Sequence, residues 1–190
     1  MGKIVVVENV TLDGVMQSPG TEDDTRGGFR HGGWATPYAD PILAETLGKG
    51  IAADNAMLFG RRTYELMQRS WGGRTDGNPF TEVLESKQKY VVSRTRTEPL
   101  PWINSTLVGG DLADLKDRID TDLVVLGSGE LVRSLSVAGL VDRYTLLLHP
   151  LTLGEGTTLF GGLDVRLELE ETVVTGKGVI IAYYRPGSAA

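Results

Sequence analysis

The sequence predicts a three-layer α/β domain with a mainly parallel mixed sheet, helices on both faces and a C-terminal antiparallel hairpin. Over most of the chain, short β-branched runs alternate with segments of helical periodicity. Strand-like segments alone finish the chain. Alternating strands and helices favour parallel pairing, whereas consecutive strands joined by tight turns pair antiparallel.

The individual elements follow from apolar spacing and turn chemistry. We expect strands at 4–7, 56–59, 89–93, 105–108, 123–126, 144–148, 165–174 and 179–185. We expect helices at 40–53, 63–68, 80–86, 111–119 and 130–138. Asp40 is a plausible N-cap because Pro41 occupies the first helical position after it, and Asp111 caps a later helix. Residues 175–178 form the turn of the closing hairpin.

Length and composition narrow the class of protein. A chain of 190 residues suits one domain, which we place at 1–185, with a disordered tail at 186–190. The sequence has no cysteine, which excludes a disulfide framework, a thiolate zinc site and a cysteine nucleophile. Its net charge of -6 argues against a nucleic-acid partner.

Nothing in the sequence indicates a membrane or a metal. The first residues lack a basic segment followed by a cleavage site, and no apolar run reaches the roughly 20 residues that span a bilayer. Glu22, Asp23 and Asp24 lack the alternating spacing of calcium loops. We therefore expect a cytoplasmic protein with no membrane partner and no metal.

Three strand ends carry the residues suited to binding phosphate. Gly60, Arg61, Arg62 and Thr63 combine a sharp turn, two cations and a helix start. Val92-Ser93-Arg94 adds a hydroxyl and a cation after the next strand, a mixture that suits a phosphate monoester. Alone, each is better explained as a strand end followed by solvated polar residues.

The third strand end is the segment Gly127-Ser128-Gly129-Glu130-Leu131, where an apolar strand passes through a glycine-rich turn into a helix. Such a turn brings backbone N–H groups and the helix dipole to a pyrophosphate, although a plain tight turn fits the segment as well. Ligands of open α/β sheets collect outside the carboxyl ends of strands. Together the three turns predict a dinucleotide with an extra phosphate, NADP rather than NAD.

These residues resemble a known family. Gly60-Arg61-Arg62-Thr63-Tyr64-Glu65 is similar to the Gly-Arg-x-Thr-aromatic-Glu motif of dihydrofolate reductases. Thr11-Leu12-Asp13-Gly14 and the segment 150–156 resemble proteins similar to the reductase domain of the bifunctional riboflavin-biosynthesis deaminase-reductase. The resemblance implies a dihydrofolate-reductase-like fold and an NADPH-dependent reductase. The substrate would be a small heterocycle (pterin-, pyrimidine- or imine-like), as for 5-amino-6-(5-phosphoribosylamino)uracil reductases.

The resemblance also assigns the site residues. Asn9, Val10 and Thr11 would lie beside the nicotinamide, and the three turns would hold the phosphates. Through the turns, it implies cofactor contacts at Gly60, Arg61, Arg62, Thr63, Val92, Ser93, Arg94, Gly127, Ser128, Gly129, Glu130 and Leu131. The long loop at 17–37 would close over the substrate.

The substrate side is less constrained. Trp34 could stack on a flat substrate or pack as a half-buried loop aromatic. Asp40 could donate the proton that reduction of a C=N bond requires, or act only as a helix cap. The alternative function is a non-catalytic NADPH-binding protein with a sensing or assembly role, and a deazaflavin-dependent reductase is a third reading. Relatives of this kind are often dimers, so the resemblance leaves a monomer and a homodimer both open.

Overall fold

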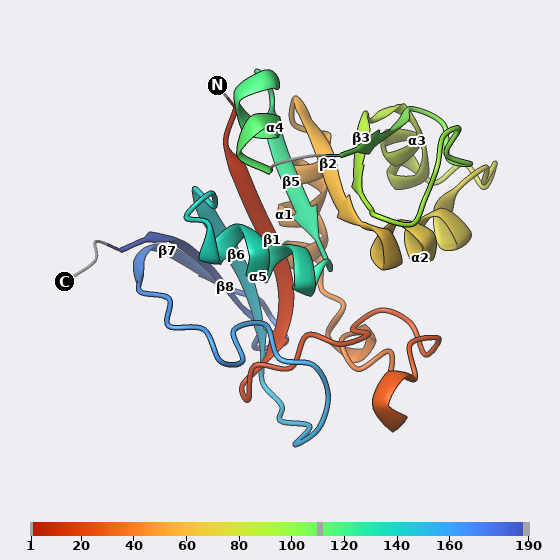
Figure 1. Ribbon diagram of the computed structural model, residues 1–190. Coiled ribbons are helices and arrows are strands. Elements are labelled where there is room, and N and C mark those ends of the chain that lie inside the picture. The colour runs from red at the N-terminus through yellow and green to blue at the C-terminus, as the bar shows by residue number, and fades with distance from the viewer. Residues whose placement is uncertain (1, 110–111, 188–190) are drawn as a thin grey trace.

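The computed structural model describes residues 2–109 and 112–187, in which a single sheet carries the fold (Figure 1). Its strand order is β4-β3-β2-β5-β1-β6-β8-β7. The strands are β1 (Ile4–Thr11), β2 (Asn55–Gly60), β3 (Lys89–Val92), β4 (Ser105–Val108), β5 (Asp122–Leu126), β6 (Arg143–His149), β7 (Leu167–Val174) and β8 (Ile180–Pro186).

The pairing confirms the predicted mixed sheet. From β4 across to β6 every neighbouring pair is parallel, with β1 between β5 and β6. Only β8 with its neighbours β6 and β7 pairs antiparallel. The hairpin turn forms at the predicted place, because the N–H of Thr175 donates to the carbonyl of Val179 at 2.9 Å. The sheet therefore brings the carboxyl ends of six parallel strands to one edge.

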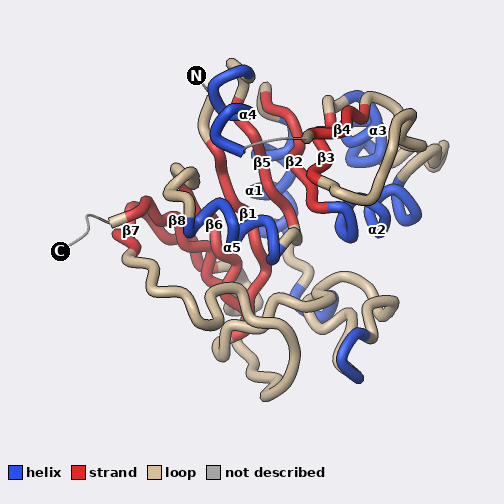
Figure 2. Tube along the Cα trace, in the orientation of Figure 1, coloured by secondary structure: helices blue, strands red, loops and turns tan. Residues whose placement is uncertain are grey.

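Helices cover both faces of the sheet, as Figures 1 and 2 show. The helices are α1 (Pro41–Ala52), α2 (Arg61–Trp71), α3 (Pro79–Ser86), α4 (Leu112–Arg118) and α5 (Gly129–Val137). Apolar residues of α1, α2 and α3 pack on one face with Met57, Phe59 and Leu147. Those of α4 and α5 pack on the other with Ile4, Val6 and Leu58. Alternation along each strand, which turns successive side chains to opposite faces, supplies both layers.

Some elements differ from their predicted bounds. β1 continues through Glu8 and Asn9 to Thr11, because its ladder with β6 runs on to Thr11, opposite His149, after the pairing with β5 has ended at Val7. α2 begins at Arg61, directly after β2. The predicted cap Asp111 lies outside the described residues. Pro186 closes β8, and the N–H of Gly187 donates to the carbonyl of Arg166 at 2.8 Å.

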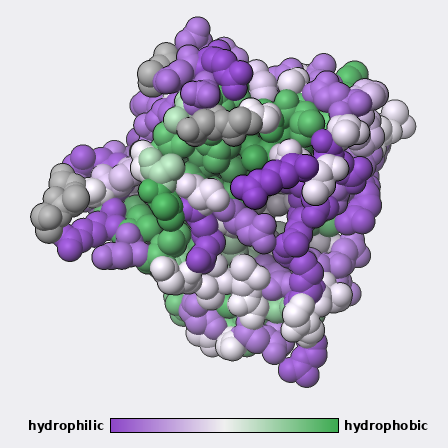
Figure 3. Space-filling view, viewed as in Figure 1, coloured by the Kyte–Doolittle hydropathy of each residue, from purple (hydrophilic) through white to green (hydrophobic). Residues whose placement is uncertain are grey.

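The α4–α5 face of the sheet is incompletely covered toward β3. Figure 3 shows a hydrophobic area over the middle of the molecule, bordered by hydrophilic residues. Tyr90 and Val92 of β3 pack against the core on this face and remain partly exposed. An apolar surface thus lies beside the carboxyl end of β3.

Candidate functional site

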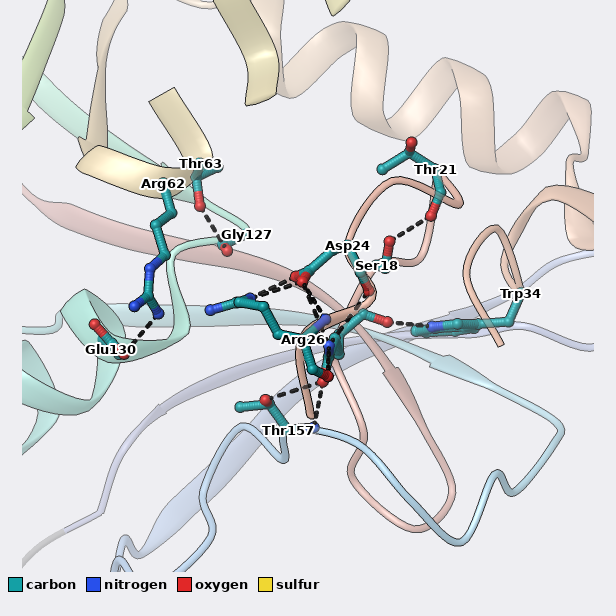
Figure 4. A network of polar contacts seen from close by, with 11 residues as sticks. Ser18, Thr21, Asp24, Arg26, Trp34, Arg62, Thr63, Gly127, Glu130 and Thr157 are labelled. Atoms are coloured by element: carbon teal, nitrogen blue, oxygen red, sulfur yellow. Dashed lines mark hydrogen bonds and ion pairs between the residues drawn. The ribbon is translucent and has the colours of Figure 1, made fainter. Parts of the chain in front are cut away.

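The turns after β2 and β5 form one structure. The backbone N–H of Gly60 donates to the hydroxyl of Ser128 at 3.0 Å, and the hydroxyl of Thr63 donates to the carbonyl of Gly127 at 2.9 Å. Across the same junction, Arg62 and Glu130 form an ion pair at 3.2 Å (Figure 4). Residues far apart in the sequence are therefore held together at the carboxyl edge of the sheet.

The turn after β3 joins this structure through α2. The guanidinium of Arg96 contacts the carboxylate of Glu65 at 2.5 Å, and Arg61 contacts the same carboxylate at 3.2 Å. Partial burial raises the pKa of Glu65, but the bonds from Arg96 and Arg61 outweigh it and hold the pKa below its usual value. The hydroxyl of Ser93 accepts the N–H of Thr95 at 3.2 Å, which leaves its own O–H to donate. We call these three turns, residues 60–63, 92–96 and 127–130, the cradle.

The helices that start at the cradle have no side-chain cap. Neither Gly60, before α2, nor Ser128, before α5, caps its helix with a side chain. Away from the cradle, Asp40 and Asn78 cap α1 and α3 by accepting backbone N–H bonds. The first N–H groups of an uncapped helix point outward with the positive end of its dipole. The cradle therefore offers two neighbouring helix starts to an anion.

The arginines of the cradle differ in whether an acidic side chain already binds them. Arg61 and Arg96 are engaged by Glu65. Arg94 is exposed and has no ion pair or hydrogen bond with another described residue. Arg62 is paired with Glu130, but both side chains are more than half exposed, and such a pair is weak. Arg94 and Arg62 are thus the two arginines available to a phosphate.

A buried carboxyl group underlies the cradle. Glu8 of β1 is 2% exposed and lies on the same face as Val6 and Val10, toward α5. Burial raises the pKa of Glu8 well above its usual value, against the opposing effect of the backbone N–H groups of Gly127 and Ser128. Its Oε1 atom has no hydrogen-bond partner among the described residues. The inner side of the turn after β5 is therefore occupied by an acid that favours its neutral form.

On the opposite face of β1, Asn9 meets His149 at the end of β6. The Nε2 atom of His149 lies 2.9 Å from the Oδ1 atom of Asn9. The imidazole is fully buried, and burial lowers its pKa to about 4. The rings of Trp34 and Tyr38 contact it edge to face, with centroids at 5.1 and 5.3 Å.

The loop that covers this end of the sheet is organised by Gln17. Its amide oxygen accepts the N–H of Thr157 at 3.0 Å, and its backbone carbonyl accepts the indole N–H of Trp34 at 2.7 Å. Its amide nitrogen donates to the carbonyl of Arg26 at 3.1 Å. From this loop Arg26, paired with Asp24, reaches toward Arg62 and Glu130 (Figure 4). A cavity of about 320 Å³ lies between Gln17, Arg26 and Thr157.

Met16 brings the loop into contact with the cradle. A Cβ atom placed on Gly129 would lie 2.6 Å from the Sδ atom of Met16, so the thioether rests against the first residue of α5. The residue that directly precedes the loop expected to close over the substrate thus lies against the expected cofactor site in this structure.

Known proteins share both this sequence pattern and this fold. Residues 2–181 match the model of the RibD C-terminal domain family. The chain belongs to this family. A curated relative, the uncharacterized protein YyaP of Bacillus subtilis, is 29% identical over 96% of this chain and 94% of its own length.

Solved structures show the same fold as this RibD C-terminal domain. The putative riboflavin biosynthesis protein of Shewanella sp. PV-4 matches with a TM-score of 0.73 and 19% identity, over 98% of this chain and 99% of that one. Dihydrofolate reductase from Enterococcus faecalis, complexed with NADP(H), matches at 0.63 and 18%, over 98% of each chain. The Thermotoga maritima deaminase/reductase matches at 0.63 and 14%, over 98% of this chain and 57% of that one. These structures add the fold, and membership of the RibD C-terminal domain family supports an oxidoreductase that acts on a heterocyclic substrate.

Not every residue expected at the site of this RibD C-terminal domain presents its side chain to a ligand. Val10 and Leu131 lie in the core, and the hydroxyl of Thr11 bonds to Asp13 within its own turn. The hydroxyl of Ser128 also donates to the carbonyl of Leu126 at 3.1 Å, so its one proton is used and it has none to donate to an anion. An anion at Ser128 could be bound only by its backbone N–H, the group that also faces Glu8.

The two residues expected on the substrate side have structural contacts. The Oδ1 atom of Asp40 accepts the N–H of Ile42 at 2.8 Å, which is the predicted cap of α1. Its Oδ2 atom lies close to Gly176 in the hairpin turn, because a Cβ atom added to that glycine would lie 2.9 Å from it. Trp34 is 7% exposed and packs on His149.

Sequence reasoning missed Glu8 and His149 as members of the site. For Glu8 a signal existed, since one acid interrupts a run of β-branched residues in a central strand. For His149 the signal was its place at a strand end, but its partners Asn9 and Trp34 are distant in sequence. Among the described residues, no cluster of ligating side chains could hold a metal ion. None of the helices in the described ranges is long and apolar enough to cross a bilayer.

Proposed function

We propose that this protein is an NADPH-dependent reductase that transfers a hydride to a small heterocyclic substrate, pterin-, pyrimidine- or imine-like. The observation that carries the proposal is the bond from Gly60 to Ser128, which unites two uncapped helix starts. Membership of the RibD C-terminal domain family supports the same activity.

The cradle fits the phosphates of NADPH. The pyrophosphate would lie at the N-terminus of α5, where Gly127 has a φ of 60° and its turn carries no side-chain cap. The extra phosphate of NADPH would lie near Arg94 and the hydroxyl of Ser93, with Arg62 close to the pyrophosphate. The adenine would lie on the partly exposed apolar surface at Val92. A dinucleotide without the extra phosphate would leave Arg94 unpaired.

The chain's part in the reaction is orientation and exclusion of water. Bound NADPH supplies the hydride, which reduces the carbon of a C=N or C=O bond while a proton goes to its nitrogen or oxygen. The end of β1 at Asn9 would wall the nicotinamide, and the loop at 17–37, with Trp34, would cover the substrate. Asp40 or an ordered water would supply the proton, and Asp40 would do so from Oδ2, because its Oδ1 accepts the cap bond from Ile42.

The experiment is a comparison of NADPH and NADH binding by tryptophan fluorescence. We expect NADPH to bind more tightly, and Arg94→Ala and Arg62→Ala each to weaken it by about 1–3 kcal/mol. Arg185→Ala is the matched control, because Arg185 lies on β8 and pairs with Glu168, far from the cradle in the sheet order. Equal affinities for both dinucleotides contradict the phosphate assignment.

A second candidate is a non-catalytic NADPH-binding protein with a sensing or assembly role. It is favoured by one observation: the only acid expected for proton donation, Asp40, is engaged as a helix cap. NADPH oxidation in the presence of dihydrofolate, a ribosylamino-pyrimidine and simple cyclic imines separates the two candidates. Silence with every compound, despite tight NADPH binding, favours the binding protein.

We also propose a cytoplasmic homodimer. The edge strand β7 and its neighbour β8 expose Leu169, Val174 and Ile180, with exposed fractions of 57%, 62% and 38%. Burying apolar side chains of this kind favours association. Light scattering of the purified protein measures its mass, and Leu169→Asp should shift a dimer toward the monomer.

A further inference from the structure

Asn9 and His149 form a polar pair at the end of two central strands. β1 and β6 pair in register with Thr11 opposite His149, so Asn9 lies two residues back, on the same face of the sheet. The pair joins the Oδ1 atom of Asn9 to the Nε2 atom of His149 at 2.9 Å. On this face lie also Val7 and Leu147, which pack against α1, where the substrate residues were expected.

The second ring nitrogen decides which atom of the imidazole carries the proton. The Nδ1 atom of His149 is buried and has no hydrogen-bond partner among the described residues. A proton on Nδ1 would be an orphaned buried donor, which native proteins rarely tolerate. The neutral imidazole therefore carries its proton on Nε2 and donates it to Asn9.

This donation fixes the amide of Asn9. Its oxygen is turned to His149, so its nitrogen is turned away. Asn9 is half-buried, and its Nδ2 atom makes no hydrogen bond with any described residue. Two N–H donors are thus presented at the end of β1, beside the cradle turn that follows β5.

The imidazole itself is held on two sides. Trp34 lies at 90° and Tyr38 at 78° to the ring of His149, and Trp34 is anchored by its bond to the carbonyl of Gln17. Edge-to-face packing of this kind restrains a ring that makes only one hydrogen bond. The loop at 17–38 therefore holds the ring that orients Asn9.

We propose that His149 is a positioning residue that locks the Asn9 amide so that its N–H groups donate to a planar carbonyl oxygen of the bound ligand. The inference rests on the proposed reductase function and adds a rule of selection to it: the ligand group at Asn9 must be a hydrogen-bond acceptor. Two groups carry this chemistry, the carboxamide oxygen of the nicotinamide and a ring carbonyl of the substrate.

Three variants separate orientation from packing. His149→Phe keeps a ring between Trp34 and Tyr38 but removes the donor to Asn9. His149→Gln restores an N–H donor to Asn9 without an imidazole. Asn9→Asp keeps an acceptor for His149 and removes both N–H groups that face the ligand.

Calorimetric titrations identify the acceptor. The probes are NADPH, 2′-phospho-ADP-ribose, which lacks the nicotinamide, and 5,6-diaminouracil added to the NADP⁺-saturated protein. We expect His149→Phe and Asn9→Asp to weaken one carbonyl-bearing probe about tenfold, the equivalent of one hydrogen bond, and His149→Gln to restore most of the affinity. Loss for NADPH but not for 2′-phospho-ADP-ribose identifies the carboxamide, and loss for 5,6-diaminouracil alone identifies the substrate carbonyl. Unchanged affinities for all probes overturn the proposal.

The tautomer is measured independently of any ligand. In a His31→Asn background His149 is the sole histidine, and ¹H–¹⁵N correlation spectra distinguish its two neutral tautomers. We expect the Nε2-protonated form, and the Nδ1-protonated form overturns the proposal. If the wild type binds no NADPH, the proposed function fails while the spectrum still decides the orientation of Asn9.

Discussion

The hydroxyl of Ser128 accepts a hydrogen bond from the backbone N–H of Gly60 at 3.0 Å, across 68 residues of sequence. The same hydroxyl donates to the carbonyl of Leu126 at 3.1 Å, so one buried side chain closes two strand ends. The serine was expected to contact a ligand. Its side chain instead builds the surface on which a ligand would lie.

Ser128→Ala should therefore lower both stability and NADPH affinity. Loss of the hydroxyl leaves the partly buried N–H of Gly60 unpaired, which costs about 1–2 kcal/mol of unfolding free energy. Urea unfolding measures this cost. Ser134→Ala is the control on the same helix, since its exposed hydroxyl bonds only to the carbonyl of Glu130. Equal effects of the two substitutions would contradict the bridging role.

Glu65→Gln tests the join between α2 and the turn after β3. The variant loses the charge that holds Arg61 and Arg96, and we expect it to be about 0.5–1 kcal/mol less stable at pH 7. The pKa of Glu65 is lower in the folded protein, so its contribution is complete above the unfolded pKa and is lost as the pH falls through the folded pKa. The stability difference should shrink on acidification. A difference that does not vary with pH would mean that packing is responsible.

The buried imidazole of His149 should make the unfolding free energy fall at acid pH. The folded pKa of about 4 lies below the ordinary imidazole pKa of 6.5, so the unfolded chain binds the extra proton between these values and stability falls as the pH falls through that window. Going from pH 7 to pH 5 should cost about 2 kcal/mol through this group. The change in unfolding free energy of the wild type, minus that of His149→Gln, isolates it from the carboxylates. Identical pH dependences of the two proteins would show that the imidazole titrates normally.

Gly129 and Met16 should be energetically coupled. Gly129→Ala places a Cβ atom 2.6 Å from the Met16 thioether, so the buried Met16 side chain must move, and we expect a loss of up to about 1 kcal/mol. In a Met16→Ala background the same substitution should cost nothing. A double-mutant cycle by urea unfolding measures the coupling. Additive effects would show that the loop does not rest on α5 in solution.

Most of the fold could be predicted because it depends on local patterns. The β-branched runs predicted the strands, and Asp40 followed by Pro41 predicted the start of α1. Each of the three turns follows a predicted parallel strand, and the carboxyl ends of parallel strands lie at one edge of the sheet. The sequence therefore predicted that the three turns of the cradle lie along the same edge. What these patterns could not supply is which arginines are free. Glu65 takes two of them through contacts that depend on how α2 meets the turn after β3.

The substrate side could not be predicted for a related reason. The partners of His149 come from β1 and from the loop at 17–38, a segment without periodicity, so no spacing in the sequence brings them together. Glu8 shows the converse case. The sequence shows an acid within a run of β-branched residues, where a polar side chain is unexpected. Only the structure shows that this acid is buried against the start of α5.

The double engagement of Glu65 has a consequence for how a charged ligand arrives. With Arg61 and Arg96 held by Glu65 and Arg62 facing Glu130, Arg94 alone among the described residues adds an unpaired positive charge to the cradle, on a molecule whose net charge is -6. Long-range attraction cannot steer an anionic dinucleotide toward such a surface. Its association rate should consequently vary little with ionic strength, and discrimination must arise at short range, after encounter.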